Sequence, residues 1–261
     1  MTVEEGIADG IDQVRHAVRY QIKHGAKLIK VCASGGVMSH TGAPGAQHYS
    51  DEELRAIVDE AHRRGLRVAA HTHGADAVRA AVEAGIDCIE HGFLIDKAAI
   101  DLMVERGTFL VPTLHALRSV RERADAAPDT FLPASMAKLD VVTQAQRRTL
   151  PEAIRRGVKV ALGTDCGVGW HGTNAREIGL LVESGMTPMG AIEAGTRVAA
   201  ELLRLDDQVG TVEAGKRADL IAVDHDPLAD PDRIGDPRSV RVVWKAGALA
   251  KDTDNRAAAR S

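Results

Sequence analysis

Apolar residues along the chain follow two alternating patterns, one with a helical period and one made of short continuous runs. Over residues 3–23 an apolar side chain recurs every three or four positions, which predicts a helix. The run 26–33 is short and largely apolar, as is typical of a buried strand. Ser50 and Glu53 have the spacing of a capping box, which predicts that a helix over 51–64 begins directly after Ser50.

The same alternation continues along the first 163 residues, and a glycine ends most of the predicted helices. The further predicted strands are 66–71, 86–91, 108–112 and 158–163; the further helices are 75–83, 98–106 and a long helical stretch over 115–156 that is looser near 126–129. Single helices between strands favour a parallel sheet. The spacing of 20 residues between His71 and His91 (91 − 71) is typical of one repeat of a βα barrel.

The pattern changes after Arg204. Residues 219–224 and 240–244 predict two strands that are separated by Pro and Asp turns, with no helix between them. We therefore expect a barrel-type α/β domain over 1–204, a small C-terminal β subdomain over 205–250 and a frayed polar tail over 251–261.

Composition and charge narrow the class of protein. The formal net charge of -4 gives no reason to expect nucleic acid as a partner, and no run of eighteen apolar residues predicts a membrane span. The first ten residues are acidic and lack the features of a secretory signal. Three cysteines, an odd number, argue against a disulfide scaffold and fit a reducing cytoplasm. We expect a cytoplasmic protein.

Four side chains with useful chemistry lie near the ends of predicted strands: Lys30, His71, His91 and Asp165. Each has an ordinary explanation by itself. A lysine can sit at a sheet edge, a histidine can be a hydrogen-bonded structural residue, and an aspartate after Gly-Thr can cap a helix or turn. Four of them in one barrel-like series favour an active site, because barrels build their sites at the carboxyl ends of the strands.

This set of side chains suits a metal site. Imidazoles and a carboxylate are ligands for zinc or a similar divalent ion. A lysine ammonium is not a ligand, but a lysine that loses its proton and takes up carbon dioxide becomes a carbamate, whose two oxygens could bridge two ions. Two such ions would lower the pKa of a shared water and polarise a carbonyl.

The sequence resembles the amidohydrolase superfamily, in particular the branch of Xaa-Pro dipeptidase-like and imidazolonepropionase-like enzymes. The segments that carry this resemblance are IKVCASGG with Lys30, VAAHTHG with His71, IEHG with His91, GTDCG with Asp165, and the later stretches 171–177 and 210–220. The resemblance extends from about Val3 to Gly247. It implies a (β/α)8 barrel of which this chain holds strands four to eight, followed by strands of a small β-sandwich subdomain.

The resemblance also implies roles for individual residues. Lys30 would be the carboxylated bridging lysine, and His71 and His91 would be ligands of one metal ion, most simply zinc. Asp165 would contact a second ion and move the proton while a hydroxide attacks the amide carbonyl of a dipeptide or an N-acyl amino acid. His73 and His115 are candidates for substrate contact, and supporting or surface roles remain open for both. We expect Cys32 and Cys166 to point away from the site.

The resemblance leaves part of the metal site unaccounted for. The superfamily begins its barrel with a strand that ends in His-x-His, and the pattern His71-Thr72-His73 does not fit that strand, because neither Lys138 nor Lys159 then lies at the end of a later strand. The chain therefore looks truncated at its N-terminus, with partial metal occupancy.

Five parallel strands cannot close an eight-stranded barrel. A homo-oligomer or a complementing chain would cover the open edges, and a catalytically incomplete fragment that acts as an interaction module is the alternative. A sugar-phosphate barrel is disfavoured, because we find no phosphate-binding glycine pattern after the last barrel strand.

Overall fold

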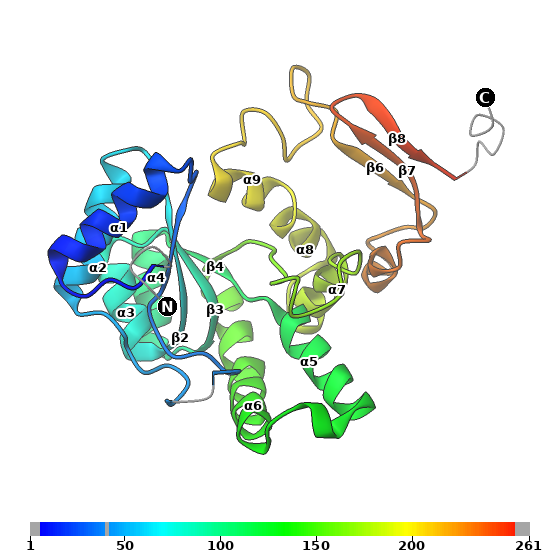
Figure 1. Cartoon of the computed structure of the whole chain (residues 1–261). Helices are drawn as coiled ribbons and strands as arrows, with labels where there is room; N and C mark the ends of the chain where they lie inside the picture. Colours follow the sequence, from blue (N-terminus) through cyan, green and yellow to red (C-terminus); the bar gives the residue numbers. More distant parts are fainter. Residues whose placement is uncertain (1–5, 40–41, 254–261) are drawn as a thin grey trace. The chain divides into compact units, whose positions relative to one another are not determined.

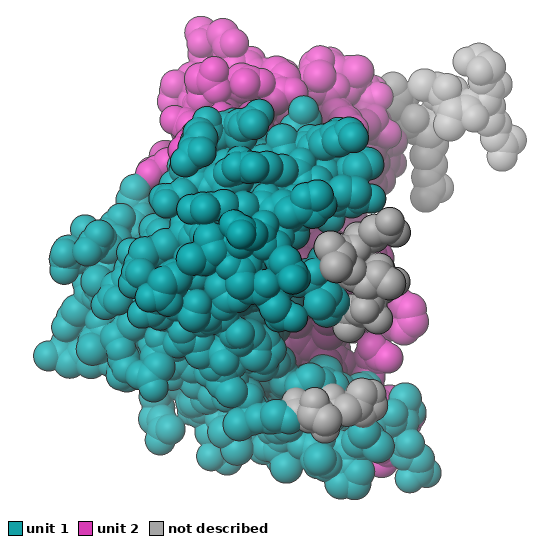
Figure 2. All heavy atoms as spheres, turned by 60° about the vertical axis from the view of Figure 1, so that its left-hand side comes forward, with its two compact units in different colours: residues 1–112, 129–159 teal, residues 113–128, 160–261 magenta. Residues whose placement is uncertain are grey.

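The computed structural model describes residues 6–39 and 42–253. The chain divides into two compact units, one of residues 1–112 with 129–159 and the other of residues 113–128 with 160–261 (Figure 2). Each unit is described by itself below.

The first unit holds the parallel strands of one sheet and the helices beside them (Figure 1). Its strands are β1 (Ile29–Cys32), β2 (Val68–Gly74), β3 (Cys88–Leu94) and β4 (Phe109–Val111), and its helices are α1 (Ile11–Lys23), α2 (Asp51–His62), α3 (Ala75–Ala84), α4 (Lys97–Arg106) and α6 (Pro133–Arg155). The sheet has the order β1-β2-β3-β4-β5, in which β5 is Lys159–Val160. The order follows the sequence, so each strand pairs with its successor, as the alternating pattern predicts.

Local signals set the ends of these helices where the sequence predicts them. The Ser50 hydroxyl accepts the Glu53 amide, and the Glu53 carboxylate accepts the Ser50 amide at 2.8 Å, which confirms the capping box of α2. Gly85 and Gly107 end α3 and α4 in the left-handed conformation that glycine adopts without steric cost.

Two predicted helices differ from the structure. The helix predicted over 3–23 begins only at Ile11; residues 6–10 are not helical, and the first five residues lie outside the described part of the chain. The stretch 115–156 is two helices, α5 (Leu114–Ala126) and α6, with a short 3-10 turn from Pro128 to Thr130 between them. This break lies at the looser patch that the sequence indicates, where Pro128 has no amide hydrogen to continue a helix.

The second unit holds α5, three further helices and a small antiparallel sheet. The helices are α7 (Arg176–Glu183), α8 (Pro188–Ala194) and α9 (Arg197–Leu203); the strands are β6 (Leu220–Val223), β7 (Val240–Lys245) and β8 (Ala248–Asp252). The chain leaves β5 earlier than predicted, because the Leu162 amide bonds to the Ala194 carbonyl instead of continuing a ladder.

The sequence does not predict β8. It pairs with β7 through a two-residue turn, in which Ala246 and Gly247 both have positive φ (50° and 80°), as tight hairpins require. Lys251 and Asp252 therefore belong to a strand rather than to the predicted frayed tail, whose last eight residues lie outside the described part of the chain. The predicted boundary after Arg204 falls within the second unit and stays a prediction.

The core of the first unit consists of aliphatic side chains. Val68 and Ala70 from β2, Ile89 from β3 and Leu110 from β4 are at most 1% exposed. Their burial supplies the apolar stabilisation that holds helices and sheet together, so the strand ends are fixed on a rigid support. No helix among the described residues is long and apolar enough to cross a membrane.

Candidate metal and substrate site

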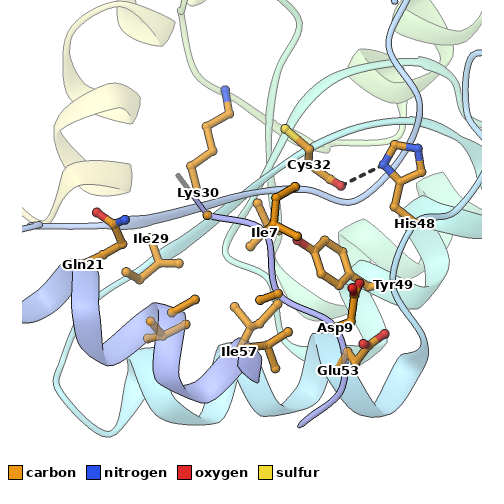
Figure 3. A pocket seen from close by; sticks show the side chains of 16 residues that line it. Ile7, Asp9, Gln21, Ile29, Lys30, Cys32, His48, Tyr49, Glu53 and Ile57 are labelled. Atoms are coloured by element: carbon orange, nitrogen blue, oxygen red, sulfur yellow. Dashed lines mark hydrogen bonds between the residues drawn. The ribbon is translucent and has the colours of Figure 1, made fainter. Parts of the chain in front are cut away.

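Lys30 lies on the side of β1 that faces away from the helices. Burial alternates along this strand, with Ile29 and Val31 buried and Lys30 and Cys32 exposed (Figure 3). The expectation that Cys32 points away from the site is therefore wrong, because residues two apart in a strand share a face. The register places Cys32 beside His71 on β2, so Lys30, Cys32 and His71 share one face of the sheet.

Two histidines of β2 lie on the same face. The ring centroids of His71 and His73 are 4.8 Å apart. His73 is 2% exposed, and its backbone amide donates to the buried Ser34 hydroxyl at 2.9 Å. The Ala33 amide donates to the His71 carbonyl at 2.9 Å. These two hydrogen bonds hold the segment that follows β1 against His71 and His73.

His91 reaches this face through an unusual backbone conformation. The ladder pairs it with Thr72, a position on the opposite face from His71. However, His91 has a φ of 71° and Gly92 a φ of 61°, which interrupts the alternation of the strand. The His91 ring then lies 4.6 Å from that of His71 and 5.1 Å from that of His73, between centroids. We call His71, His73 and His91 the histidine cluster.

The imidazoles that are buried in this cluster are held neutral. Burial, followed by repulsion from His71, lowers the pKa of His73 to about 3. Burial, the two neighbouring histidines and the positive charge of Lys30 lower the pKa of His91 to about 2. Neutral imidazole is the form that binds a metal ion, and the effect of Lys30 on His91 places its amine within electrostatic range of the cluster.

The donor set fits a metal centre only if Lys30 takes part. Among the described residues, no three or more His, Cys, Asp or Glu side chains form a group that could hold a metal ion. The ligand set that the sequence predicts in the first unit is of another kind, with two imidazoles and a lysine that becomes a ligand as a carbamate. Within the described structure, the buried His73 Nδ1 atom makes no hydrogen bond, so this ring nitrogen is not engaged by another residue.

The loop after β1 passes directly beside the cluster. A Cβ atom added at Gly36 would lie 3.3 Å from His71 Nε2, tighter than most contacts of that kind. Glycine at this position therefore leaves the space in which the His71 ring sits.

Asp165 and His115 belong to the second unit. Asp165 is exposed and lies in the loop that follows β5. Its backbone φ is 51°, and its carbonyl accepts the Val168 amide at 3.1 Å. His115 lies in the first turn of α5 and is 1% exposed, so it is not a surface residue. Its Nε2 atom lies 2.9 Å from the Thr173 hydroxyl in the loop that carries Asp165.

The sequence analysis assigned no role to three polar residues near these side chains. Glu90 shares a register position with His71, Ser34 accepts the His73 amide, and Glu177 is a fully buried carboxylate. A signal existed for Glu177, which lies on the buried stripe of α7, four positions before Leu181.

A separate pocket of about 690 Å³ lies between β1 and the helices α1 and α2 (Figure 3). Its walls are mostly apolar, and Asp9, Tyr49 and Glu53 line one end. Figure 3 shows that the Lys30 amine extends away from the apolar wall formed by Ile29 and Ile57. All four residues of β1, Lys30 and Cys32 among them, line this pocket, whereas none of the three histidines of the cluster does.

Sequential parallel strands with a lysine and a histidine cluster near their carboxyl ends define an α/β protein with part of a βα barrel. The model of the amidohydrolase family matches residues 1–250, and the chain belongs to this family. The fold class and the resemblance that the sequence predicts are thereby confirmed.

Individual relatives are similar over nearly the whole chain. Ochratoxinase of Aspergillus niger is 42% identical over 250 residues, which cover 94% of this chain and 50% of the relative. A solved structure of a Xaa-Pro dipeptidase with bound methionine is 40% identical with a TM-score of 0.90, and the match covers 96% of this chain and 61% of that one. A prolidase in complex with N-methylphosphonate-L-proline is 38% identical with a TM-score of 0.88, over 94% and 60% of the two chains. The chain spans about half the length of the curated relatives it matches.

Proposed function

We propose that this chain carries the lysine and histidine ligands of a metal-dependent hydrolase that cleaves C–N bonds in a small substrate such as a dipeptide or an N-acyl amino acid. The observation that carries this proposal is the left-handed backbone of His91, which brings its neutral ring beside His71 on the face that holds Lys30. The names of two relatives, a Xaa-Pro dipeptidase and a prolidase, support a dipeptide as the substrate class.

Some of these residues would bind metal ions, and the others would transfer the proton or orient the substrate. Lys30 as a carbamate, His71 and His91 would hold one divalent ion, most simply zinc, and Asp165 would contact a second. Such ions supply Lewis acidity toward a carbonyl and lower the pKa of water. The Asp165 carboxylate takes up a proton at its oxygen and passes it to the leaving nitrogen. His73 and His115 orient the substrate.

The test combines metal analysis with hydrolysis of a panel of dipeptides and N-acyl amino acids. We expect activity to fall to background after chelation and to return with zinc. Lys30→Ala should abolish activity and reduce the bound metal. Lys27→Ala should change neither, because Lys27 is an exposed residue that precedes β1. Activity that survives chelation, or that is equal in Lys30→Ala and the native chain, contradicts the proposal.

A second candidate is an incomplete hydrolase that works only as one part of an assembly. The order β1-β2-β3-β4-β5 leaves β1 at the edge of its sheet, and the chain spans about half of its curated relatives. An exposed edge strand is a template for pairing with another chain. This candidate predicts a homo-oligomer, or a stable complex with a chain that supplies His-x-His, by light scattering. An inactive monomer that binds no such chain contradicts it.

We place the protein in the cytoplasm. Its three cysteines, Cys32, Cys88 and Cys166, are all free thiols in the structure, which fits a reducing compartment. Finding the protein outside the cell membrane by fractionation would overturn this assignment.

A further inference from the structure

The first turn of α5 is capped by a carboxylate from a different helix. The first amides of a helix have no acceptor within it, and Thr113, which precedes α5, provides no side-chain cap. Instead, the Leu114 amide donates to Glu177 Oε1 at 2.8 Å and the His115 amide donates to Glu177 Oε2 at 2.7 Å. Both oxygens of one side chain on α7 therefore hold the start of α5.

Glu177 holds this position although burial of a carboxylate is unfavourable. Its side chain is 0% exposed. The neighbouring Arg176 forms its ion pair with Glu122, at 2.7 Å, and not with Glu177. Desolvation of a carboxylate costs free energy unless strong hydrogen bonds and favourable dipoles compensate it. The two charge-assisted bonds and the positive end of α5 offset part of this cost at the residue that carries the His115 ring.

The His115 ring has a defined hydrogen-bond pattern. The Thr173 hydroxyl donates to the Trp170 carbonyl at 2.6 Å, so its oxygen is available to accept the proton on His115 Nε2, 2.9 Å away. This pattern assigns the proton to Nε2 and leaves a lone pair on Nδ1, which is buried and makes no hydrogen bond within the described residues. Burial and the charge of Arg176 lower the pKa of His115, which keeps the ring neutral.

The partner of His115 lies in the loop that carries Asp165. A Cβ atom at Gly169 would lie 3.1 Å from His115 Nε2, so this loop also passes close to the ring at a second point. The Asn174 amide group donates to the Thr164 hydroxyl at 3.2 Å and closes the loop on itself. The loop from Thr164 to Asn174 is therefore fastened to α5 through His115.

We propose that Glu177 is a positioning residue: by capping the first turn of α5 it holds the His115 ring against Thr173, and through Thr173 it fixes the loop that carries Asp165. The positioning stands on the geometry of the second unit alone. Its effect on turnover rests on the proposed function, in which Asp165 moves the proton.

The test compares Glu177→Gln with Glu183→Gln in the full chain. Glu183 lies on the same helix, is 56% exposed and pairs with Arg118, so the same chemical change is made outside the cap. In Glu177→Gln an NH2 group, which donates, replaces one of the two oxygens, so the backbone amide that faces it loses its acceptor. The chain is labelled with ¹⁵N-histidine and its ring signals are assigned with the help of His115→Gln.

We expect native His115 to give the signals of the Nε2–H form. In Glu177→Gln these signals should broaden or move toward tautomer exchange, and kcat should fall about tenfold while KM changes little, because a loosened proton carrier affects the reaction more than binding. Glu183→Gln should match the native chain in both measurements. Equal His115 signals in the two variants overturn the proposal.

A second variant covers the case in which Glu177→Gln does not fold. Thr173→Val removes the hydroxyl but leaves the cap, and it should change the His115 ring signals and lower kcat without affecting the signal of the His115 backbone amide, which donates to Glu177. Unchanged ring signals in this variant would overturn the link to the loop. If the native chain hydrolyses nothing in the panel, the proposed function fails, but the ring signals still decide whether Glu177 positions His115.

Discussion

Replacing Glu177 by glutamine should change how the stability of the protein depends on pH. Burial, working against the hydrogen bonds from His115 and Leu114, raises the pKa of Glu177 from 4.5 to about 7. An acid whose pKa is higher in the folded state binds its proton more tightly there. Its contribution to stability is therefore complete below about pH 4.5 and is lost as the pH rises through about 7.

The size of this effect follows from the pKa difference. A change from 4.5 to about 7 is a difference of about 2.5, and each pKa unit corresponds to about 1.4 kcal/mol, which gives about 3 kcal/mol. The free energy of unfolding of the native chain minus that of Glu177→Gln should fall by about this amount between pH 4.5 and pH 8. Other titrating groups are common to both proteins and largely cancel in the difference.

Urea denaturation at a series of pH values measures this difference, with Glu183→Gln as the control whose difference from the native chain should stay nearly constant. If the Glu177→Gln difference is also constant with pH, the carboxyl titrates normally in the folded state and the reasoning from its burial is wrong. If the difference rises with pH, the hydrogen bonds from the two amides outweigh desolvation.

Three further substitutions test the site and its support. Gly36→Ala should weaken zinc binding about tenfold in a titration, because the added Cβ atom presses on the His71 ring; equal affinity would show that the loop yields. Ser50→Ala should lower the free energy of unfolding by about 1 kcal/mol, because the Glu53 amide loses its cap, and a loss within error of zero contradicts this. Leu110→Ala should cost about 3–5 kcal/mol through a cavity in the core, measured by urea denaturation; a loss below about 1 kcal/mol would mean that the core collapses around it.

The sequence was a good guide wherever a feature depends on neighbouring residues. The capping box of α2 and the glycines after α3 and α4 involve contacts of a few residues, so their patterns predict the observed ends. The parallel order of the sheet also follows from alternating strands and helices. Lys30 and His71 share a face for the same reason, because strand alternation and a simple register fix it.

Features that depend on distant contacts or on unusual backbone were beyond such reasoning. Alternation places His91 on the opposite face from His71, and only its positive φ brings the rings together. The role of Glu177 requires α7 to pack beside a helix that starts more than sixty residues earlier in the chain. The hairpin that forms β8 depends on the left-handed backbone of Ala246. Alanine is not a residue type from which such a turn is predicted.

The residue at position 91 has to meet two separate requirements, one set by the backbone conformation and one by the proposed chemistry. Folding requires a residue that tolerates a φ of 71°, a demand that asparagine or aspartate meets more easily than a β-branched residue. The proposed chemistry requires an imidazole. A library of all substitutions at this position, sorted once for folded protein and once for bound metal, should therefore return a broad first set and a much narrower second set that lies within it and contains histidine.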